Sequence, residues 1–463
     1  MVDGLIGRLV AEVGEGAVLT DPDVTAGYSR DMTALAPSGS PLAVVLPTNA
    51  EQVRAVVRLC ARARVPIVPR GAGSGLSGAA NAVDGCVVLS TVKMNEILEI
   101  DPDNRLAVVQ PGVVNLDLRT ATEKHGLFYP PDPSSYDWCT IGGNLATNAG
   151  GLCCVKYGVT SDSVLGLEVV LADGELLRTG RRTVKGVAGY DLTKLFVGSE
   201  GTLGVITSAT LALRPLPHAP STLVAAFESV EAAGAAVTSV VREGVVPSLM
   251  EIMDGTSIRA VEAYLRTEIG PAGGCEALLL CQSDSGGPAA ARELEIIEGI
   301  CSATGATMTY ATDDITEGGM LLRARRAVAL ALDAYGAWLT DDVCVPRTRI
   351  AELLAGCRRV GERVGLRIAV VGHAGDGNMH PTIVYDGDSA DERARARRAF
   401  DEIMAIGLEL GGTVTGEHGV GRLKQDWLAT EIGPVGLRVH RALKAALDPE
   451  NLFNPGAMFS AGS

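Results

Sequence analysis

The chain has 463 residues, enough for two or three domains with separate cores, and its composition, 47% hydrophobic and 21% charged, is globular rather than disordered. The net charge of −15 argues against a nucleic-acid surface or an anionic membrane as the partner. We expect no secretory signal and no membrane span, because no uncharged apolar run reaches ~18 residues. The ten cysteines are scattered, a pattern typical of reduced thiols in a cytoplasmic protein and not of an iron–sulfur site.

The first third of the chain reads as alternating strands and helices. Residues 43–47 and 65–69 are expected strands. Between them, Thr48 and Glu51 match a capping box that opens a helix with an apolar face. This strand–helix–strand unit leads directly into a glycine-rich loop at residues 70–78.

The loop satisfies the G-x-G-x-x-G pattern at Gly73, Gly75 and Gly78. A nicotinamide-binding Rossmann motif would have to open a helix, whereas residues 86–90 read as another strand. We therefore expect a strand-to-strand loop whose backbone N–H groups form a nest for a pyrophosphate. A simple tight turn is the alternative.

Glycine and asparagine clusters recur between residues 130 and 204, more densely than hairpin turns alone require. A long ligand that lies along backbone amides would explain them. A loop-rich β domain with ordinary turns is the alternative.

Proline punctuation at residues 214–217 indicates a domain boundary. Beyond it the pattern favours an α+β domain with an antiparallel sheet covered by helices. A capping box at Ser389 and Glu392 should open a helix that ends near residue 410. The expected strands are 222–227, 248–252, 277–282, 307–312, 338–345, 367–371 and 413–415; the expected helices are 230–243, 289–304, 320–335 and 348–364, with a helical tail after residue 423.

Three of the six histidines fall in two short glycine-rich segments, 373–380 and 416–419. His373, His380 and Glu417 offer the two imidazoles and one carboxylate that catalytic Zn²⁺ or another divalent ion uses. His418 would remain available as a base, since a neutral imidazole accepts a proton near neutral pH. The alternative is that these segments are turns with a solvated Glu–His hydrogen bond.

Taken together, the segments resemble the FAD-dependent D-2-hydroxyacid dehydrogenases of the vanillyl-alcohol-oxidase type. This family includes D-lactate dehydrogenase, the glycolate oxidase flavin subunit and D-2-hydroxyglutarate dehydrogenase. The likeness covers residues 42–459. It is carried by residues 69–75, 131–133, 140–151, 156–158, 373–380, 416–419 and 454–456.

The resemblance implies an α+β protein with a two-subdomain FAD-binding domain at 1–216, a substrate and metal-binding cap domain at 217–422, and a C-terminal helical segment at 423–463 that returns to the FAD domain. FAD should be bound without a covalent link, because the glycine loop holds no His or Cys. The implied cofactor-binding residues are Arg70, Gly71, Ala72, Gly73, Ser74, Gly75, Leu76, Ser77, Pro131, Asp132, Gly142, Gly143, Asn144, Thr147, Asn148, Gly150, Gly151, Tyr157, Gly158, Glu200, Gly201, Ile206 and Asn454.

The implied reaction is metal-assisted oxidation of a D-2-hydroxyacid, with hydride transfer to FAD N5 and His418 as the base. Family members place an arginine against the substrate carboxylate. Arg325 aligns best with it, with Arg323 and Arg326 as alternatives. Ala329 and Thr340 stand where the 2-hydroxyglutarate enzymes have a threonine and a lysine for a second carboxylate, which favours a monocarboxylate, D-lactate ahead of glycolate.

The expected electron acceptor is a quinone, a cytochrome, an electron-transfer flavoprotein or another subunit, and contact with a membrane would come only through that acceptor. A homodimer is one candidate assembly. Two other interpretations stay open: a metallohydrolase that uses the same ligands, and a flavin-containing subunit in which the metal is mainly structural.

Overall fold

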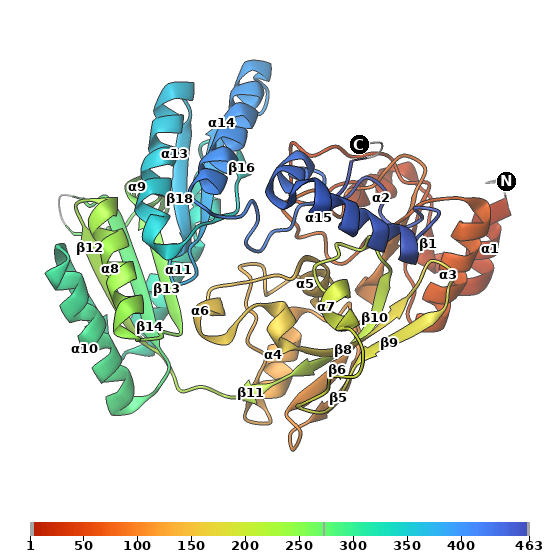
Figure 1. The fold of residues 1–463 in the computed structure, drawn as a ribbon, viewed down its shortest axis with the longest axis horizontal. Helices are drawn as coiled ribbons and strands as arrows, with labels where there is room; N and C mark the ends of the chain where they lie inside the picture. Colours follow the sequence, from red (N-terminus) through yellow and green to blue (C-terminus); the bar gives the residue numbers. More distant parts are fainter. Residues whose placement is uncertain (1–3, 272–273, 461–463) are drawn as a thin grey trace. The chain divides into compact units, whose positions relative to one another are not determined.

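The computed structural model describes residues 4–271 and 274–460, and its contacts divide the chain into two compact units (Figure 1). Unit 1 combines residues 1–150, 158–216 and 417–463; unit 2 combines residues 151–157 and 217–416. One division coincides with the predicted boundary at 216/217. Another falls at 416/417, six residues before the predicted one at 422/423, and residues 151–157, predicted to belong to the FAD-binding domain, fall in unit 2.

A four-stranded sheet forms the first part of unit 1, in the order β1-β2-β4-β3. β4 pairs in parallel with both β2 and β3, and β1 is antiparallel to β2. Helices α1 and α3 supply part of its core. The predicted strand–helix–strand unit and the strand that follows the glycine loop are confirmed. The elements are α1 (Leu5–Val13), β1 (Val18–Leu19), α2 (Pro22–Thr25), β2 (Ala43–Val45), α3 (Ala50–Ala63), β3 (Ile67–Arg70) and β4 (Val87–Ser90).

The N-cap of α3 lies one residue later than the predicted capping box requires. Asn49 is the N-cap, and its Oδ1 accepts a hydrogen bond from the Gln52 amide at 3.0 Å. The Gln52 side chain in turn accepts from the Thr48 amide at 2.8 Å. Thr48/Glu51 and Asn49/Gln52 both fit the motif, and the stronger intrinsic N-cap, asparagine, takes the position.

A five-stranded antiparallel sheet, β5-β6-β10-β8-β9, forms the second part of unit 1. The C-terminal residues of the chain also belong to this unit. The Ile67 amide of β3 donates to Leu452 O at 2.8 Å, and the Asn454 amide donates to Ile67 O at 2.7 Å. The tail thus lies directly beside β3. The elements are β5 (Ile97–Asp101), β6 (Leu106–Val109), α4 (Asn115–Glu123), β7 (Leu127–Phe128), α5 (Ile141–Thr147), β8 (Val164–Val170), β9 (Leu176–Gly180), α7 (Leu192–Phe196), β10 (Val205–Ala212), β11 (Arg214–Pro215) and α15 (Gln425–Leu447), which is kinked at Gly433.

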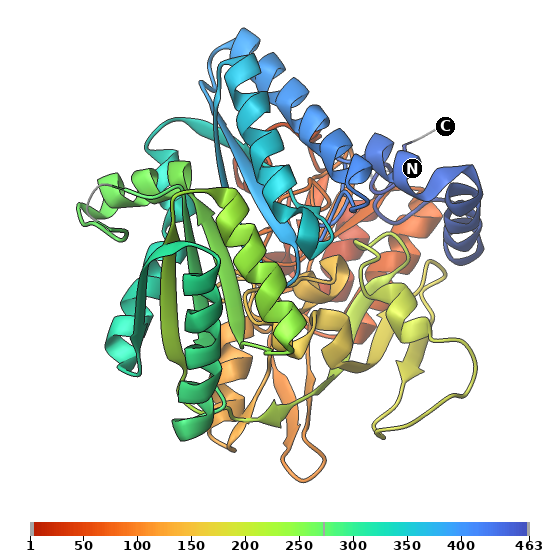
Figure 2. The ribbon, with the colours of Figure 1, turned by 60° about the vertical axis from the view of Figure 1, so that its left-hand side comes forward.

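Unit 2 is built on an antiparallel sheet in the order β15-β12-β14-β13-β18-β19-β16, with β17 also paired to β19. Helices α10, α8, α13 and α14 follow one another across one face (Figure 2), while α9, α11 and α12 pack on the other. The predicted helix-covered antiparallel sheet is confirmed. The elements are α6 (Cys154–Tyr157), β12 (Ser221–Phe227), α8 (Val230–Glu243), β13 (Leu249–Asp254), α9 (Gly255–Leu265), β14 (Ala277–Ser283), α10 (Gly287–Ala303), β15 (Ala306–Thr312), α11 (Ile315–Arg326), α12 (Val328–Asp333), β16 (Ala337–Thr340), β17 (Val343–Cys344), α13 (Ile350–Val364), β18 (Arg367–His373), β19 (Asn378–Tyr385) and α14 (Ala390–Glu409).

Three expected elements of unit 2 differ from the structure. The single helix expected at 320–335 is two helices that meet at Ala327. The strand expected at 338–345 is interrupted at Asp341 and Asp342, since buried aspartates with partners elsewhere do not fit a regular ladder. The strand expected at 413–415 is only an isolated bridge at Thr413.

β19 was not predicted. Pro381 lies in its middle, and a proline usually argues against a central strand. The register explains why the strand tolerates it. Thr340 pairs with Thr382 and Val343 pairs with Met379, so Pro381 lies opposite the interruption at 341–342. Its missing N–H therefore falls where the neighbouring ladder is already broken.

Gly372 provides a test of how tightly β18 and β19 pack. A Cβ at this position would lie 2.4 Å from Asn378 O and 2.7 Å from the Met379 Cα. We expect Gly372→Ala to destabilise the protein by about 1–3 kcal/mol, because backbone atoms must move apart. The measurement is urea unfolding followed by circular dichroism.

The control is Gly299→Ala, on the exposed face of α10, where a Cβ would meet nothing within 4 Å. This change should stabilise the helix by about 0.5–1 kcal/mol. Equal effects of the two substitutions would contradict the packing described here.

Candidate functional site

The glycine loop after β3 has backbone amides that no other part of the protein uses. Within the described part of the chain, the N–H groups of residues 72–76 donate no hydrogen bond. Gly71 approaches closely: a Cβ there would lie 2.3 Å from Thr140 Oγ1. Gly73 has φ +81°, which favours glycine. A run of available amides with no side chains in the way fits the phosphates of a dinucleotide.

Arg70, at the start of this loop, is directed into the protein. Its guanidinium donates to Arg30 O at 2.9 Å and to Ala80 O at 3.3 Å. Burial lowers the pKa of this guanidinium, and the carboxylate of Asp31 opposes that shift. Asp31 in turn accepts from the Gly78 amide at 2.8 Å. Through these contacts Arg70 holds the start of the loop in place, and Asp31 holds its end at Gly78.

The other predicted cofactor segments of unit 1 carry similar internal support. Thr140 caps α5, and Asn144 accepts from the Asn115 side chain at 3.0 Å. Asn148 has φ 53° and its side chain accepts from the Ser161 amide at 2.9 Å. The polar side chains therefore hold the turns, which leaves the backbone as the surface available to a ligand.

Glu200 is a buried carboxylate with φ 52° that holds the chain after His418. It accepts from the Val420 amide at 2.6 Å and from the Gly421 amide at 2.7 Å. Burial raises the pKa of Glu200 to about 7 in spite of these two hydrogen bonds. Asn454 donates to Glu200 O and to Ala79 O, both at 2.8 Å, so the C-terminal tail joins the same network.

His418, the predicted base, is tied to the glycine loop within unit 1. Ser77 Oγ donates to His418 O at 3.1 Å, and Ser77 O accepts from the amides of Arg422 and Leu423 at 2.9 and 3.1 Å. Nε2 of His418 lies 3.7 Å from Glu417 Oε1. The main chain around the predicted base is thus held by hydrogen bonds to Ser77 of the glycine loop.

His373 and His380 lie on adjacent strands of unit 2, at the end of β18 and within β19. Their ring centroids are 5.1 Å apart at an angle of 80°, and a nitrogen of each ring lies within 4.8 Å of one of the other. Both side chains are nearly buried. Contrary to the expectation of a glycine-rich loop, His380 belongs to a strand. Paired strands fix the two imidazoles more rigidly than a loop would.

Two buried carboxylates that the sequence interpretation missed lie beside these imidazoles. Glu251 of β13 is the direct cross-strand partner of His373, and its Oε1 is 2.6 Å from His373 Nδ1. Asp342 has Oδ1 3.8 Å from His380 Nδ1, and its Oδ2 accepts from Thr415 Oγ1 at 2.7 Å and the Gly416 amide at 3.0 Å. Asp342 thus holds the residues that directly precede Glu417.

The arrangement fits a divalent metal ion. Metal-binding histidines characteristically direct the other ring nitrogen at a carboxylate; His373 Nδ1 does so towards Glu251, while His380 Nδ1 lies 3.8 Å from Asp342, too far for a hydrogen bond. Nε2 of His373 is then the nitrogen that would bind the ion. Glu417, the predicted third ligand, belongs to unit 1 and follows Gly416, the last residue of unit 2.

Arg325, the predicted carboxylate-binding residue, is a buried side chain on α11. Its Nη2 lies 2.7 Å from Glu251 Oε2. Of the two alternatives, Arg323 is exposed and Arg326 is half-buried. The structure therefore brings Arg325, Glu251 and His373 together in one buried polar cluster.

Tyr157, a predicted cofactor residue, falls in the short segment of unit 2 that comes from the first third of the chain. Its hydroxyl donates to Asp284 Oδ2 at 2.5 Å, and Lys156 pairs with the other oxygen of the same carboxylate. Asp284 was not singled out from the sequence. It anchors residues 156–157 to the end of β14.

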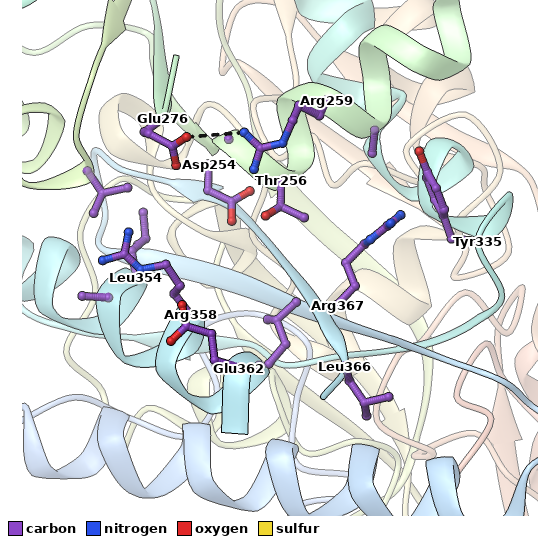
Figure 3. A pocket seen from close by; sticks show the side chains of 16 residues that line it. Asp254, Thr256, Arg259, Glu276, Tyr335, Leu354, Arg358, Glu362, Leu366 and Arg367 are labelled. Carbon is purple, nitrogen blue, oxygen red and sulfur yellow. Dashed lines mark hydrogen bonds and ion pairs between the residues drawn. The ribbon is translucent and has the colours of Figure 1, made fainter. Parts of the chain in front are cut away.

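A separate hollow of about 490 Å³ lies at the opposite end of β18 (Figure 3). Arg367 at the start of that strand contributes to it, whereas His373 ends the strand roughly 20 Å away. Its charged lining is mixed: Arg259, Arg358 and Arg367 stand among Asp254, Glu276 and Glu362. None of the predicted site residues lines it.

Comparison with known proteins agrees with these features. Residues 216–458 match the family "FAD linked oxidases, C-terminal domain", and residues 41–180 match "FAD binding domain". The glycolate oxidase subunit GlcD of Bacillus subtilis is 43% identical over 94% of this chain and 92% of its own length. A D-lactate dehydrogenase of Anaerostipes hadrus is 35% identical over 96% of this chain and 95% of its own length.

The fold is shared with p-cresol methylhydroxylase, whose structure with bound substrate superposes with a TM-score of 0.82 at 22% identity, covering 100% of this chain and 98% of the other. The chain is therefore an FAD-dependent oxidoreductase, and it belongs to the FAD-linked oxidase family of the D-lactate dehydrogenases and glycolate oxidase subunits. Among the described residues, no helix is both long and apolar enough to cross a membrane.

The raised pKa of Glu200 predicts how stability depends on pH. A carboxyl group with a folded pKa of about 7 holds its proton more tightly in the folded state, so its stabilising contribution is lost as the pH rises towards that value. Relative to wild type, Glu200→Gln should gain up to about 3 kcal/mol in the free energy of unfolding between pH 4.5 and 8.

Chemical denaturation of both proteins over this pH range measures the difference. Asp448→Asn, which removes another buried carboxylate of unit 1, is the comparison variant. A Glu200→Gln effect that does not change with pH would show that folding leaves the pKa of this carboxyl group unchanged.

Proposed function

We propose that this oxidoreductase oxidises a small D-2-hydroxyacid, D-lactate first, to the 2-oxoacid, with a divalent metal ion bound by His373, His380 and Glu417. The observation that carries the proposal is the buried pair of histidines on adjacent strands, with Glu251 2.6 Å from Nδ1 of His373. A chain that needed only FAD would have no use for such a costly arrangement of buried polar groups.

The bound cofactor would lie along the amides of residues 72–76 and the turns at residues 142–151. Oxidation of the hydroxyacid removes the hydroxyl proton and the C2 hydrogen with its two electrons. FAD, when bound, supplies the acceptor for that hydride, and the metal ion lowers the pKa of the substrate hydroxyl. Everything else must come from side chains of this protein.

His418 would take the hydroxyl proton on an imidazole nitrogen. Ser77 Oγ donates a hydrogen bond to His418 O, which fixes the main chain at His418 and so limits the positions of the imidazole ring. Arg325 would bind the substrate carboxylate through N–H groups that are not directed at Glu251. A guanidinium has five such donors, and one ion pair leaves several available.

Two positions, Ala329 and Thr340, differ from the 2-hydroxyglutarate enzymes in a way that favours a substrate with one carboxylate. Ala329 is exposed on α12, and the hydroxyl of Thr340 lies 3.1 Å from that of Thr382. Neither residue supplies a cation for a second carboxylate. Glycolate is the second candidate substrate, because the 43% identical relative is named a glycolate oxidase subunit. A metallohydrolase would leave the FAD-binding half of the chain without a role.

The electrons would leave to a quinone, a cytochrome, an electron-transfer flavoprotein or another subunit. The acidic net charge and the lack of a spanning helix in the described residues are consistent with a cytoplasmic protein that meets a membrane only through its acceptor. Homodimer formation remains a further proposal. Reoxidation of the reduced protein by each acceptor, followed by stopped flow, would distinguish them.

The test of the reaction is flavin bleaching. Purified protein should be yellow, and its flavin absorption should bleach anaerobically with D-lactate or glycolate but not with L-lactate or D-2-hydroxyglutarate. His418→Asn should keep the flavin and the metal but lower the rate of bleaching about 10²–10⁴-fold, because the base is lost.

A matched control is His440→Asn, on α15, which should bleach at the wild-type rate. Full activity in His418→Asn would remove that residue from the proposed mechanism. Yellow protein that no hydroxyacid bleaches would overturn the substrate class.

Removal of the metal gives an independent test. After treatment with a chelator, the protein should keep its yellow colour and lose turnover, and Zn²⁺ or Mn²⁺ should restore it. Elemental analysis measures the metal before and after treatment. Undiminished turnover in protein shown to contain no metal would contradict the metal-dependent reaction.

A further inference from the structure

Glu251 is a fully buried charged residue in the histidine region, and each of its two oxygens lies close to a polar partner. Its side chain is 0% exposed, and its two partners, His373 and Arg325, are 5% and 7% exposed. Oε1 lies 2.6 Å from His373 Nδ1, within hydrogen-bond distance, and Oε2 lies 2.7 Å from Arg325 Nη2 in an ion pair that lacks hydrogen-bond geometry. One carboxylate therefore joins the end of β18 to the last turn of α11.

The strand register makes this contact unavoidable. Glu251 and His373 are direct partners in the antiparallel pair of β13 and β18, so their side chains leave the same face of the sheet. Leu249 and Met253, two positions to either side of Glu251, lie in the core beneath α9, α11 and α12. Glu251 thus replaces an apolar residue in the middle of a packed face, where only its two polar partners offset the cost of burial.

The contact also determines which nitrogen of His373 is available. A carboxylate accepts hydrogen bonds, so a neutral His373 ring must carry its proton on Nδ1 and its lone pair on Nε2. Nε2 is then the atom that can bind a metal ion. The ring cannot rotate to exchange the two nitrogens without leaving Nδ1–H and Glu251 unpaired in the core.

The same carboxylate fixes Arg325. Its guanidinium is planar, so one contact at Nη2 constrains the directions of the remaining N–H groups. Without Glu251, the buried guanidinium of Arg325 would need another anion or a water molecule as its partner. The two predicted functions, metal binding and recognition of the substrate carboxylate, therefore share one support.

We propose that Glu251 is a positioning residue that sets His373 for metal binding and Arg325 for the substrate carboxylate at the same time. The inference rests on the proposed function, because it needs both the metal ion and the hydroxyacid. Glu251 itself touches neither.

The test measures metal affinity on the FAD-bound protein after the metal has been removed. Titration with Zn²⁺ against a competing chelator should give an affinity 10–100-fold lower for Glu251→Gln than for wild type, the usual size of effect for a residue that orients a metal ligand. Asp254→Asn is the matched control, since Asp254 is at the end of the same strand and caps α9. It should bind Zn²⁺ like wild type.

Glu251→Gln also leaves Arg325 without its counter-ion, so the variant can fail to fold. The double variant Glu251→Gln/Arg325→Met removes both charges and retains the volume, a replacement that buried ion pairs tolerate. It should be folded and should show the same 10–100-fold loss of Zn²⁺ affinity. If Glu251→Gln does not fold, the Zn²⁺ affinity of the double variant tests the positioning role.

A folded single variant gives a second readout. Saturated with Zn²⁺, it should show a KM for D-lactate raised at least tenfold, because Arg325 is no longer held, and a smaller change in kcat. Asp254→Asn should change neither constant. A purely structural role for Glu251 would lower the yield of folded protein and leave the KM of the folded fraction unchanged.

The outcomes separate the two proposals. Wild-type Zn²⁺ affinity in the Glu251 variants would overturn the positioning role and leave the proposed reaction standing. Wild-type protein that binds no divalent metal would overturn the metal-dependent reaction and the positioning role together. Loss of affinity in Asp254→Asn as well would show a general effect of charge loss in β13 and would also overturn it.

Discussion

A buried carboxylate in the middle of a sheet is the constraint on which the histidine region depends. Glu251 must be paired on both sides, and the two partners that satisfy it come from β18 and α11, far apart in the chain. The register of β13 against β18 and the packing of α11 over the sheet are therefore linked. A shift of either would separate a charge from its partner inside the core, which is far more costly than the loss of an apolar contact.

The sequence predicts much of this structure because local signals are strong there. The helix from Val230 to Glu243, the capping box at Ser389 and the strand-to-strand character of the glycine loop all follow from spacing and turn chemistry. The histidines and Glu417 could be named because their residue types are rare and clustered. Local rules fail at Pro381 in β19. A proline argues against a central strand, and the interruption at residues 341–342 that accommodates it lies in another segment of the chain.

The supporting residues could not be found in the same way. Glu251 lies in an apolar run, Leu-Met-Glu-Ile-Met, and nothing in that run indicates that its strand will pair with the one that ends at His373. Asp342 is one of two adjacent aspartates that resemble a surface turn, yet both are buried. The only available signal is a lone acid within an apolar strand pattern. Such a residue needs a partner, but the sequence does not say which one.

The point at which the chain passes from unit 2 to unit 1 has a consequence for how such proteins can diversify. It lies between Gly416 and Glu417. His373 and His380 therefore belong to unit 2, while Glu417 and His418 belong to unit 1. Under the proposed function, an exchange of residues 151–157 and 217–416 between relatives would replace the sheet that carries His373 and His380 and would leave His418 in place. The proposed metal-binding histidines and the proposed base could then change independently of one another.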